Sequence, residues 1–193
     1  MRLFAAVLPP QAVIEELAAE TAALRRIPGA ERLRWTGHAG WHFTLAFYGE
    51  VADGILPELH TRLARAAHRH GPFPLRISGG GRFDHKVLWA GAAGGREPMR
   101  HLADAAGAAA RRAGVDMDEH RRYTPHLTLA RARGGEARVD LVPFADALAE
   151  YESEEWTVAD LALVRSNLPA SGVPGEQPRY ETVASWPLGD GGR

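Results

Sequence analysis

The chain has 193 residues and a mass of 20.9 kDa, and its 45% hydrophobic and 24% charged residues are typical of one soluble globular domain. Its 23 basic and 24 acidic residues give a net charge of −1, so it lacks the basic excess of a protein that coats duplex DNA. The chain has no cysteine, which excludes a disulfide scaffold, a thiol nucleophile and any cysteine-based metal site.

Signals for export or membrane insertion are weak. No apolar run approaches the ~20 residues needed to span a bilayer. The apolar run near the N-terminus is cut by Pro9 and Pro10 and is too short for a signal peptide. We therefore expect a cytoplasmic protein that does not bind membranes.

Hydrophobic residues recur with strand-like and helix-like spacing in turn, which predicts a mixed set of elements. The expected strands cover residues 2–8, 41–48, 73–78, 86–92, 126–131, 156–165 and 180–186. The expected helices cover residues 10–26, 55–67, 99–110 and 141–150. The triglycine at 79–81 is predicted to be a turn, and residues 167–179 a loop. No linker divides the chain, and this order predicts an α+β fold with mainly antiparallel strands.

A short repeat is the strongest signal in the sequence. Residues 42–46 (HFTLA) and 126–130 (HLTLA) differ only at their second position, and both fall on expected strands. Because successive side chains on a strand point to opposite faces, the His, Thr and Ala of each copy are predicted to share one face. The apolar residues between them would anchor each strand on the core. Two such strands facing each other would present two imidazoles and two hydroxyls to one small anion.

These side chains suit the hydrolysis of a phosphodiester. The reaction needs a base to deprotonate water and an acid to protonate the departing alkoxide, and imidazole can do either near neutral pH. In-line attack places the nucleophile and the leaving group on opposite sides of phosphorus, so two opposed imidazoles match its geometry. Threonine hydroxyls can donate hydrogen bonds to the non-bridging oxygens.

A single His-x-Thr sequence would be explained more simply by an ordinary strand, but two copies with matching neighbours favour a shared site. Other features of the sequence give weaker evidence of a functional site. Trp35 is expected in the core rather than stacked on a base. His60, His68 and His70 lack the carboxylate or cysteine partners that would complete a metal site.

The paired motifs resemble the two-histidine (2H) phosphoesterase superfamily, whose signature is a pair of H-x-[ST]-x motifs. The flanking segments are similar to those of the bacterial and archaeal RNA 2′,3′-cyclic phosphodiesterases, also called 2′-5′ RNA ligases. These segments are RLFAAVLPP at 2–10, RW at 34–35, WHFTLAFYGEV at 41–51, VLWAG at 87–91, YTPHLTLAR at 123–131, LVRS at 163–166 and YETVASWPL at 180–188. The resemblance covers nearly the whole chain. It implies one domain over 1–193 with two pseudo-symmetric lobes around a central cleft, helices on the outside, and a flexible tail at 189–193.

The resemblance also implies roles and a reaction. His42 is expected to be the general acid and His126 the general base, with Thr44 and Thr128 binding phosphate. The expected reaction opens an RNA terminal 2′,3′-cyclic phosphate to a 2′-phosphate, with no metal and no cofactor. The expected partners are RNA or oligonucleotide ends bearing a cyclic phosphate, bound by a monomer, with no role for duplex DNA.

Three alternative functions stay open: a phosphodiesterase acting on another cyclic or 2′-5′-linked nucleotide, an ATP-independent 2′-5′ RNA ligase, and a non-catalytic module that binds RNA ends. An ATP-dependent ligase is disfavoured, because Lys86 lacks the K-x-D-G pattern of a nucleotidyl-accepting lysine.

The role of Arg131 is open at this level. The family motif often continues to an arginine at this position, which would bind phosphate. On a straight strand, however, Arg131 would point to the core face, opposite His126. Either the strand bends or ends at Ala130, or Arg131 is a packing or surface residue.

Overall fold

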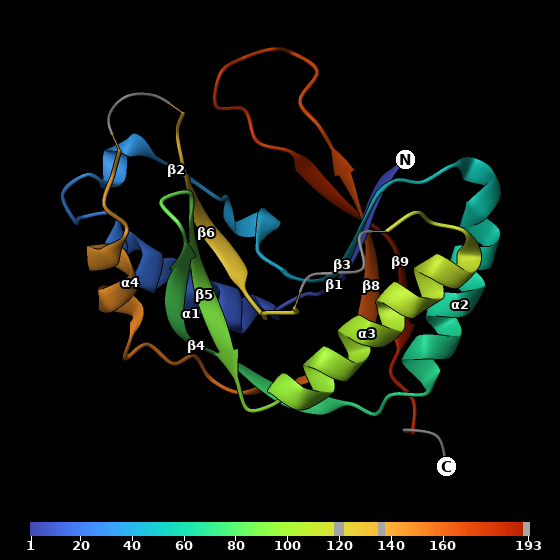
Figure 1. The fold of residues 1–193 in the computed structure, drawn as a ribbon. Helices are drawn as coiled ribbons and strands as arrows, with labels where there is room; N and C mark the ends of the chain where they lie inside the picture. The colour runs from blue at the N-terminus through green and yellow to red at the C-terminus, as the bar shows by residue number, and fades with distance from the viewer. Residues whose placement is uncertain (118–121, 135–137, 191–193) are drawn as a thin grey trace.

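The fold was analysed in a computed structural model that describes residues 1–117, 122–134 and 138–190. Its strands form two antiparallel sheets (Figure 1). The first sheet has the order β3-β1-β8-β9. Its strands are β1 (Arg2–Val7), β3 (Phe43–Glu50), β8 (Asp160–Asn167) and β9 (Arg179–Pro187).

The second sheet has the order β2-β6-β5-β4-β7 and lies on the left in Figure 1. Its strands are β2 (Leu33–Trp35), β4 (Phe73–Phe83), β5 (Val87–Ala93), β6 (Leu127–Ala132) and β7 (Trp156–Val158). The first copy of the repeat therefore belongs to β3 in one sheet, and the second copy to β6 in the other.

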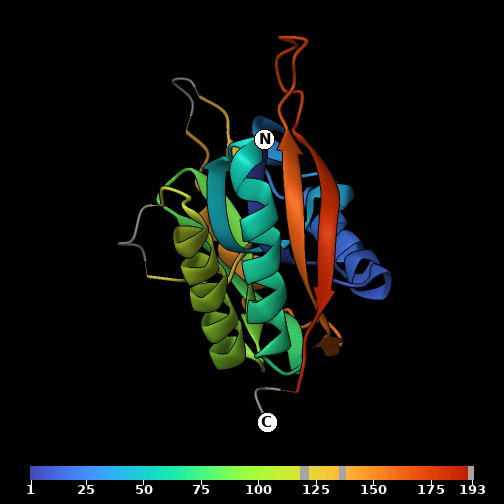
Figure 2. The ribbon, with the colours of Figure 1, turned by 90° about the vertical axis from the view of Figure 1, so that its right-hand side faces the viewer.

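Helices cover the outer faces of both sheets. They are α1 (Gln11–Leu24), α2 (Leu56–His68), α3 (Arg96–Ala113) and α4 (Val142–Leu148), with short 3₁₀ turns at Ala30–Arg32, His38–Gly40 and Asp53–Ile55. Figure 2 shows α2 and α3 side by side; α3 packs on β3 and α2 on β9. On the other lobe, α4 packs on β4. The apolar stripe of α2, buried at Leu59 and Leu63, is the kind of pattern that specifies an amphipathic helix.

One hydrophobic core joins the two lobes. It contains Phe43 and Leu45 of β3 together with Leu127 and Leu129 of β6, all buried. These residues lie on the core side that the alternation of the repeat predicts. The expected α+β class, with two lobes of mainly antiparallel strands, is confirmed.

The triglycine prediction is wrong. Gly79, Gly80 and Gly81 lie inside β4, and the turn falls at residues 84–86. Gly79 has φ +64° where the β4–β5 register shifts, a conformation that glycine adopts without strain. A Cβ on Gly81 would lie 2.4 Å from the ring of Trp89, so glycine is needed there for close packing. The run of glycines therefore corresponds to a β-bulge within β4 rather than to a turn.

The prediction of one strand over 156–165 is also wrong. The chain changes sheets at Ala159: β7 pairs with β4 in the second sheet, and β8 pairs with β1 and β9 in the first. The apolar positions change phase at this point, from Trp156 and Val158 to Leu161 and Leu163, as the change of partner requires.

Two further expectations concern membranes and the C-terminus. Within the described residues, none of the helices combines the length and apolar character needed to cross a bilayer. Of the tail predicted at 189–193, residues 191–193 lie outside the described residues. The backbone N–H of Gly189 donates to the carbonyl of Ala67 at the end of α2 (3.1 Å).

Candidate active site

The two copies of the repeat meet at a cleft of about 390 Å³ between the lobes. Its wall contains all five site residues predicted from the sequence: His42, Thr44, His126, Thr128 and Arg131. Residues that sequence reasoning did not assign to the site complete it: Arg2, Phe4, Arg34, Thr36, Gly40, Phe47, Ser166, Leu168, Gln177, Pro178 and Tyr180. In the part of the chain that the structure describes, no aspartate or glutamate lines this cleft.

Each copy of the repeat contains a register shift at its fourth residue. On β3, Thr44 pairs with Ala6 and Ala46 with Ala5, so Leu45 is an extra residue. On β6, Thr128 pairs with Trp89 and Ala130 with Leu88, so Leu129 is an extra residue. An extra residue of this kind is a β-bulge, and it reverses the phase of the side chains that follow.

The bulges correct the predicted face of the alanines and answer the question of Arg131. Ala46 and Ala130 are buried rather than placed beside the His and Thr of each copy. The next residues, Phe47 and Arg131, are exposed and line the cleft. The strand bends between Thr128 and Ala130, which brings Arg131 to the same cleft as the two histidines.

The two histidines are oriented in the same way. Each precedes its strand by one residue, and its Nδ1–H donates to the carbonyl two residues earlier: His42 to Gly40 at 2.8 Å and His126 to Thr124 at 2.7 Å. Because a carbonyl oxygen only accepts, Nδ1 carries the hydrogen in both rings. In the neutral imidazoles Nε2 is therefore the nitrogen with a free lone pair.

The two Nε2 atoms differ in their partners. Nε2 of His42 lies 3.0 Å from Oγ1 of Thr44, whose hydroxyl can donate to the neutral ring. Among the described residues, no hydrogen bond is formed by Nε2 of His126. The first imidazole is thus paired with its own motif threonine, and the second is available to an incoming group.

Aromatic rings from neighbouring strands support both imidazoles. His42 packs against Phe4 of β1 (4.6 Å between centroids) and the edge of Tyr180 of β9 (5.2 Å). His126 packs against Phe83 of β4 at 4.8 Å and lies 6.2 Å from Trp89. These contacts restrict each ring to one orientation.

Both histidines are weaker bases than a free imidazole. Burial lowers the pKa of His42 to about 4, with repulsion from His126 and Arg131 adding to the effect and the bond to Gly40 opposing it. Burial also lowers the pKa of His126, again with Arg131 contributing and its bond to Thr124 opposing. Both rings are therefore neutral at pH 7, and a bound anion would favour their protonated forms.

Three of the residues that the sequence did not assign to the cleft show which ones carried a signal in the sequence. Arg34 and Tyr180 lie in segments that carry the family resemblance, so a signal for them existed. Gln177 lies in the proline-rich loop between β8 and β9 and had none. Its side chain accepts from the N–H of Gly37 (3.1 Å) and donates to the carbonyl of Trp35, which ties this loop to the other lobe.

Trp35 packs against the core but is only partly buried, and it lines a second cavity beside the cleft. Its indole N–H donates to the carbonyl of Ala30 (2.9 Å), and its ring lies 6.2 Å from that of Phe144 in the core. For metals, the described residues hold no group of three or more histidine, aspartate or glutamate side chains placed to share an ion.

Solved structures share this architecture. A protein of Thermus thermophilus superimposes with a TM-score of 0.77 at 27% identity, over 100% of this chain and 99% of its own. Escherichia coli LigT in its apo form superimposes with a TM-score of 0.72 at 24% identity, over 98% of both chains. The protein thus has the same fold as LigT, with two antiparallel lobes and a cleft between them.

Sequence comparison gives the family. A sequence model described as the 2′-5′ RNA ligase superfamily matches residues 10–169. A relative from Thermus thermophilus, named RNA 2′,3′-cyclic phosphodiesterase, is 31% identical over 100% of this chain and 93% of its own length. One of the same name from Geobacillus stearothermophilus is 30% identical over 80% of this chain, but the match spans only 47% of that relative. The chain belongs to the 2′-5′ RNA ligase superfamily, which confirms the family and the class of enzyme, the cyclic phosphodiesterases, that the sequence predicts.

Proposed function

We propose that the protein hydrolyses an RNA terminal 2′,3′-cyclic phosphate to a 2′-phosphate by acid–base catalysis with two histidines. The observation that carries this proposal is that His42 and His126 line one cleft, each with Nδ1 bonded to a backbone carbonyl so that Nε2 is the nitrogen available for proton transfer. The shared name of the curated relatives supports RNA as the substrate class.

The proposed step moves one proton at each histidine. Nε2 of neutral His126 takes a proton from water as the water oxygen bonds to phosphorus. The bond from phosphorus to O3′ breaks on the opposite side, and Nε2–H of protonated His42 gives its proton to O3′. The product carries a 2′-phosphate and a 3′-hydroxyl, and transfer of a proton from His126 back to His42 restores the starting state.

Three side chains would hold the phosphate during this step. Arg131 can pair with two oxygens at once through its planar guanidinium group. Thr128 and Thr44 can each donate a hydroxyl hydrogen to a non-bridging oxygen. When His42 is protonated, its Nε2 no longer offers a lone pair to Thr44, which leaves the threonine hydrogen free to donate to the phosphate.

The donor set of the cleft fits chemistry without a metal ion. Divalent ions such as Mg²⁺ are held mainly by carboxylate oxygens, and the described lining of the cleft provides imidazole, hydroxyl and guanidinium groups instead. Arg131 would supply the positive charge that a metal provides in other phosphoesterases. Because one chain supplies both histidines, both threonines and Arg131, we propose that a monomer is active.

The test is turnover of a short RNA that ends in a 2′,3′-cyclic phosphate, followed by phosphorus NMR of the product. We expect a single 2′-phosphomonoester. A 3′-phosphate product would overturn the proposed cleavage of the bond to O3′. Absence of turnover, with tight binding of the same RNA, would favour a binding module.

A further inference from the structure

A second cavity adjoins the cleft. It measures about 340 Å³ and shares three wall residues with the cleft: Arg34, Thr36 and Gln177. Two more arginines, Arg25 and Arg133, line this cavity and not the cleft. We refer to it as the arginine pocket. A ligand that occupies the cleft could therefore continue into the pocket past Arg34 without leaving the surface.

The arginine pocket is cationic and has no internal counter-charge. No carboxylate among the described residues lines it, and Arg25, Arg34 and Arg133 form no ion pair there. The two cavities near α3 differ, because each has a carboxylate in its wall, Glu97 in one and Asp104 in the other. The positive charge of the arginine pocket is thus a local feature of this side of the cleft.

The register of the second sheet places two like charges opposite each other. Arg34 of β2 pairs directly with Arg131 of β6. Opposite residues of an antiparallel pair lie about 4.5–5.5 Å apart at Cβ, and like charges at that distance are destabilising. Two neighbouring anionic groups, one on each guanidinium, would remove this repulsion.

The chemistry of the pocket favours a phosphate over a base. The guanidinium of Arg25 lies over the ring of Trp35, 5.6 Å from its centroid, so this face of the indole is covered. The arginine side chains themselves are exposed and free to bind phosphate oxygens. Gln177 holds the neighbouring loop against Trp35 and Gly37, which fixes the boundary between the pocket and the cleft.

We propose that the arginine pocket binds the internucleotide phosphate on the 5′ side of the terminal nucleotide. This proposal rests on the proposed function, in which the cyclic phosphate itself occupies the cleft beside His42 and His126. It makes the preferred substrate an oligonucleotide of at least two nucleotides rather than a cyclic mononucleotide.

The experiment compares three substrates: adenosine 2′,3′-cyclic phosphate, the dinucleotide ApA with a 2′,3′-cyclic phosphate end, and the same dinucleotide with a neutral methylphosphonate linkage. We expect wild-type kcat/KM to be roughly tenfold or more higher for the charged dinucleotide, the worth of one charge-assisted contact. The neutral linkage should remove this advantage.

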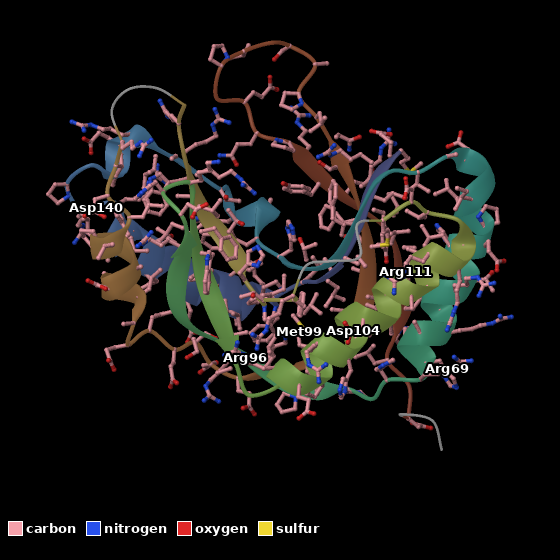
Figure 3. The ribbon with its side chains drawn as sticks, in the orientation of Figure 1. Arg69, Arg96, Met99, Asp104, Arg111 and Asp140 are labelled. Atoms are coloured by element: carbon pink, nitrogen blue, oxygen red, sulfur yellow. The ribbon has the colours of Figure 1, made fainter. Side chains whose placement is uncertain are left out.

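The matching variant carries Arg25→Gln and Arg133→Gln. It should lose the preference for the charged dinucleotide while turning over the mononucleotide, which also shows that it is folded. The salt dependence of dinucleotide binding should fall by roughly 0.7 in log–log slope for each phosphate contact removed. Arg69→Gln is the control, because Arg69 lies at the far end of α2, away from both cavities (Figure 3).

The outcomes separate this proposal from the proposed function. Equal kcat/KM for the charged dinucleotide and the mononucleotide, or a preference that survives the double variant, overturns the arginine pocket alone. Absence of turnover of all three substrates overturns the proposed function. In that case calorimetry with 2′-phosphorylated products still decides: tighter, arginine-dependent binding of the dinucleotide supports the pocket, and equal binding overturns it.

Discussion

The two copies of the repeat, on β3 and β6, differ at one residue, bend at the same position and bury equivalent side chains, yet they contribute unequally to the cleft. After the bulge at Leu45, β3 presents Phe47, whereas β6 presents Arg131 at the equivalent place. The repeated pattern thus builds one geometry twice, and the residue beyond the bulge makes the site asymmetric. Of these two strands, β6 supplies a guanidinium that can bind phosphate, whereas β3 supplies an aromatic ring, over which the guanidinium of Arg2 lies at 4.8 Å.

The histidines show the same combination of likeness and difference. Both fix Nδ1 on a backbone carbonyl, but only His42 has a hydroxyl, that of Thr44, at its Nε2 within the described residues. Burial lowers both pKa values. The backbone is pseudo-symmetric, but the two imidazoles are not equivalent. Such a difference is needed if one imidazole is to act as an acid and the other as a base.

The largest effect is expected from removing either imidazole. His42→Ala and His126→Ala should each lower kcat on the RNA cyclic phosphate by about 10²–10⁴-fold, the usual worth of a positioned acid or base. The double variant should be little worse than the poorer single variant, because the two act as a unit. Single-turnover assays measure this directly, and near-normal rates in both single variants would show that the motifs are not catalytic.

The free energy of unfolding should depend on pH because the pKa of His42 differs between the folded and the unfolded state. Its pKa is lower in the folded state than the value of about 6.5 in the unfolded chain, so the unfolded state binds the extra proton between these values. The stabilisation is present above pH 6.5 and is lost as the pH falls toward 4, by up to about 3 kcal/mol.

Denaturant unfolding at pH 7 and pH 4.5 measures this loss. The His42→Gln variant should show a shallower fall in the free energy of unfolding than wild type. His126→Gln serves as the paired comparison, and it should also flatten the curve, because burial lowers its pKa as well. An unchanged slope in His42→Gln would show that this ring is not held neutral by burial.

The residue beyond the bulge should matter more on β6 than on β3. Arg131→Gln is expected to lower kcat/KM by roughly tenfold to a hundredfold, since hydrogen bonds to charged groups are worth about 1.5–3 kcal/mol. Arg131→Lys should recover part of this loss, because it keeps the charge without the planar pair of donors. Phe47→Leu should cost less than Arg131→Gln in the same assay, and the reverse order would contradict the asymmetry.

The smallest expected effect is that of a chelator. Because the proposed step uses only protein side chains, hydrolysis should continue at the same rate in EDTA. Loss of activity that a divalent ion restores would show that a metal takes part, and would remove Arg131 from its proposed role.

Local sequence was sufficient for part of this site. The alternation of the repeat placed Phe43 and Leu127 in the core, and the matching letters indicated that His42 and His126 belong to one site. Both inferences depend only on the alternation of side chains between the two faces of a strand, which can be recognised from a few consecutive residues.

The features that the sequence did not predict depend on partner strands. A bulge is decided by how two strands pair, and leucine fits the bulged positions 45 and 129 as well as a regular strand. Glycine is required at 81 by the ring of Trp89 and at 80 by Leu148 and the backbone of Trp89, contacts that exist only once β4 has packed against β5 and α4. The same reason hides the contact of Gln177 with the other lobe.

The division of labour between the two histidines is tested most directly with a substrate that needs no acid. A 3′-deoxynucleoside 2′-(4-nitrophenyl) phosphate has a leaving group that departs without protonation and no neighbouring hydroxyl that could attack phosphorus, so attack by water still requires a base. Relative to wild type, His42→Ala should recover most of its lost rate on this substrate, and His126→Ala should stay slow. Recovery of His126→Ala instead, or of neither variant, would contradict the assignment of His42 as acid and His126 as base.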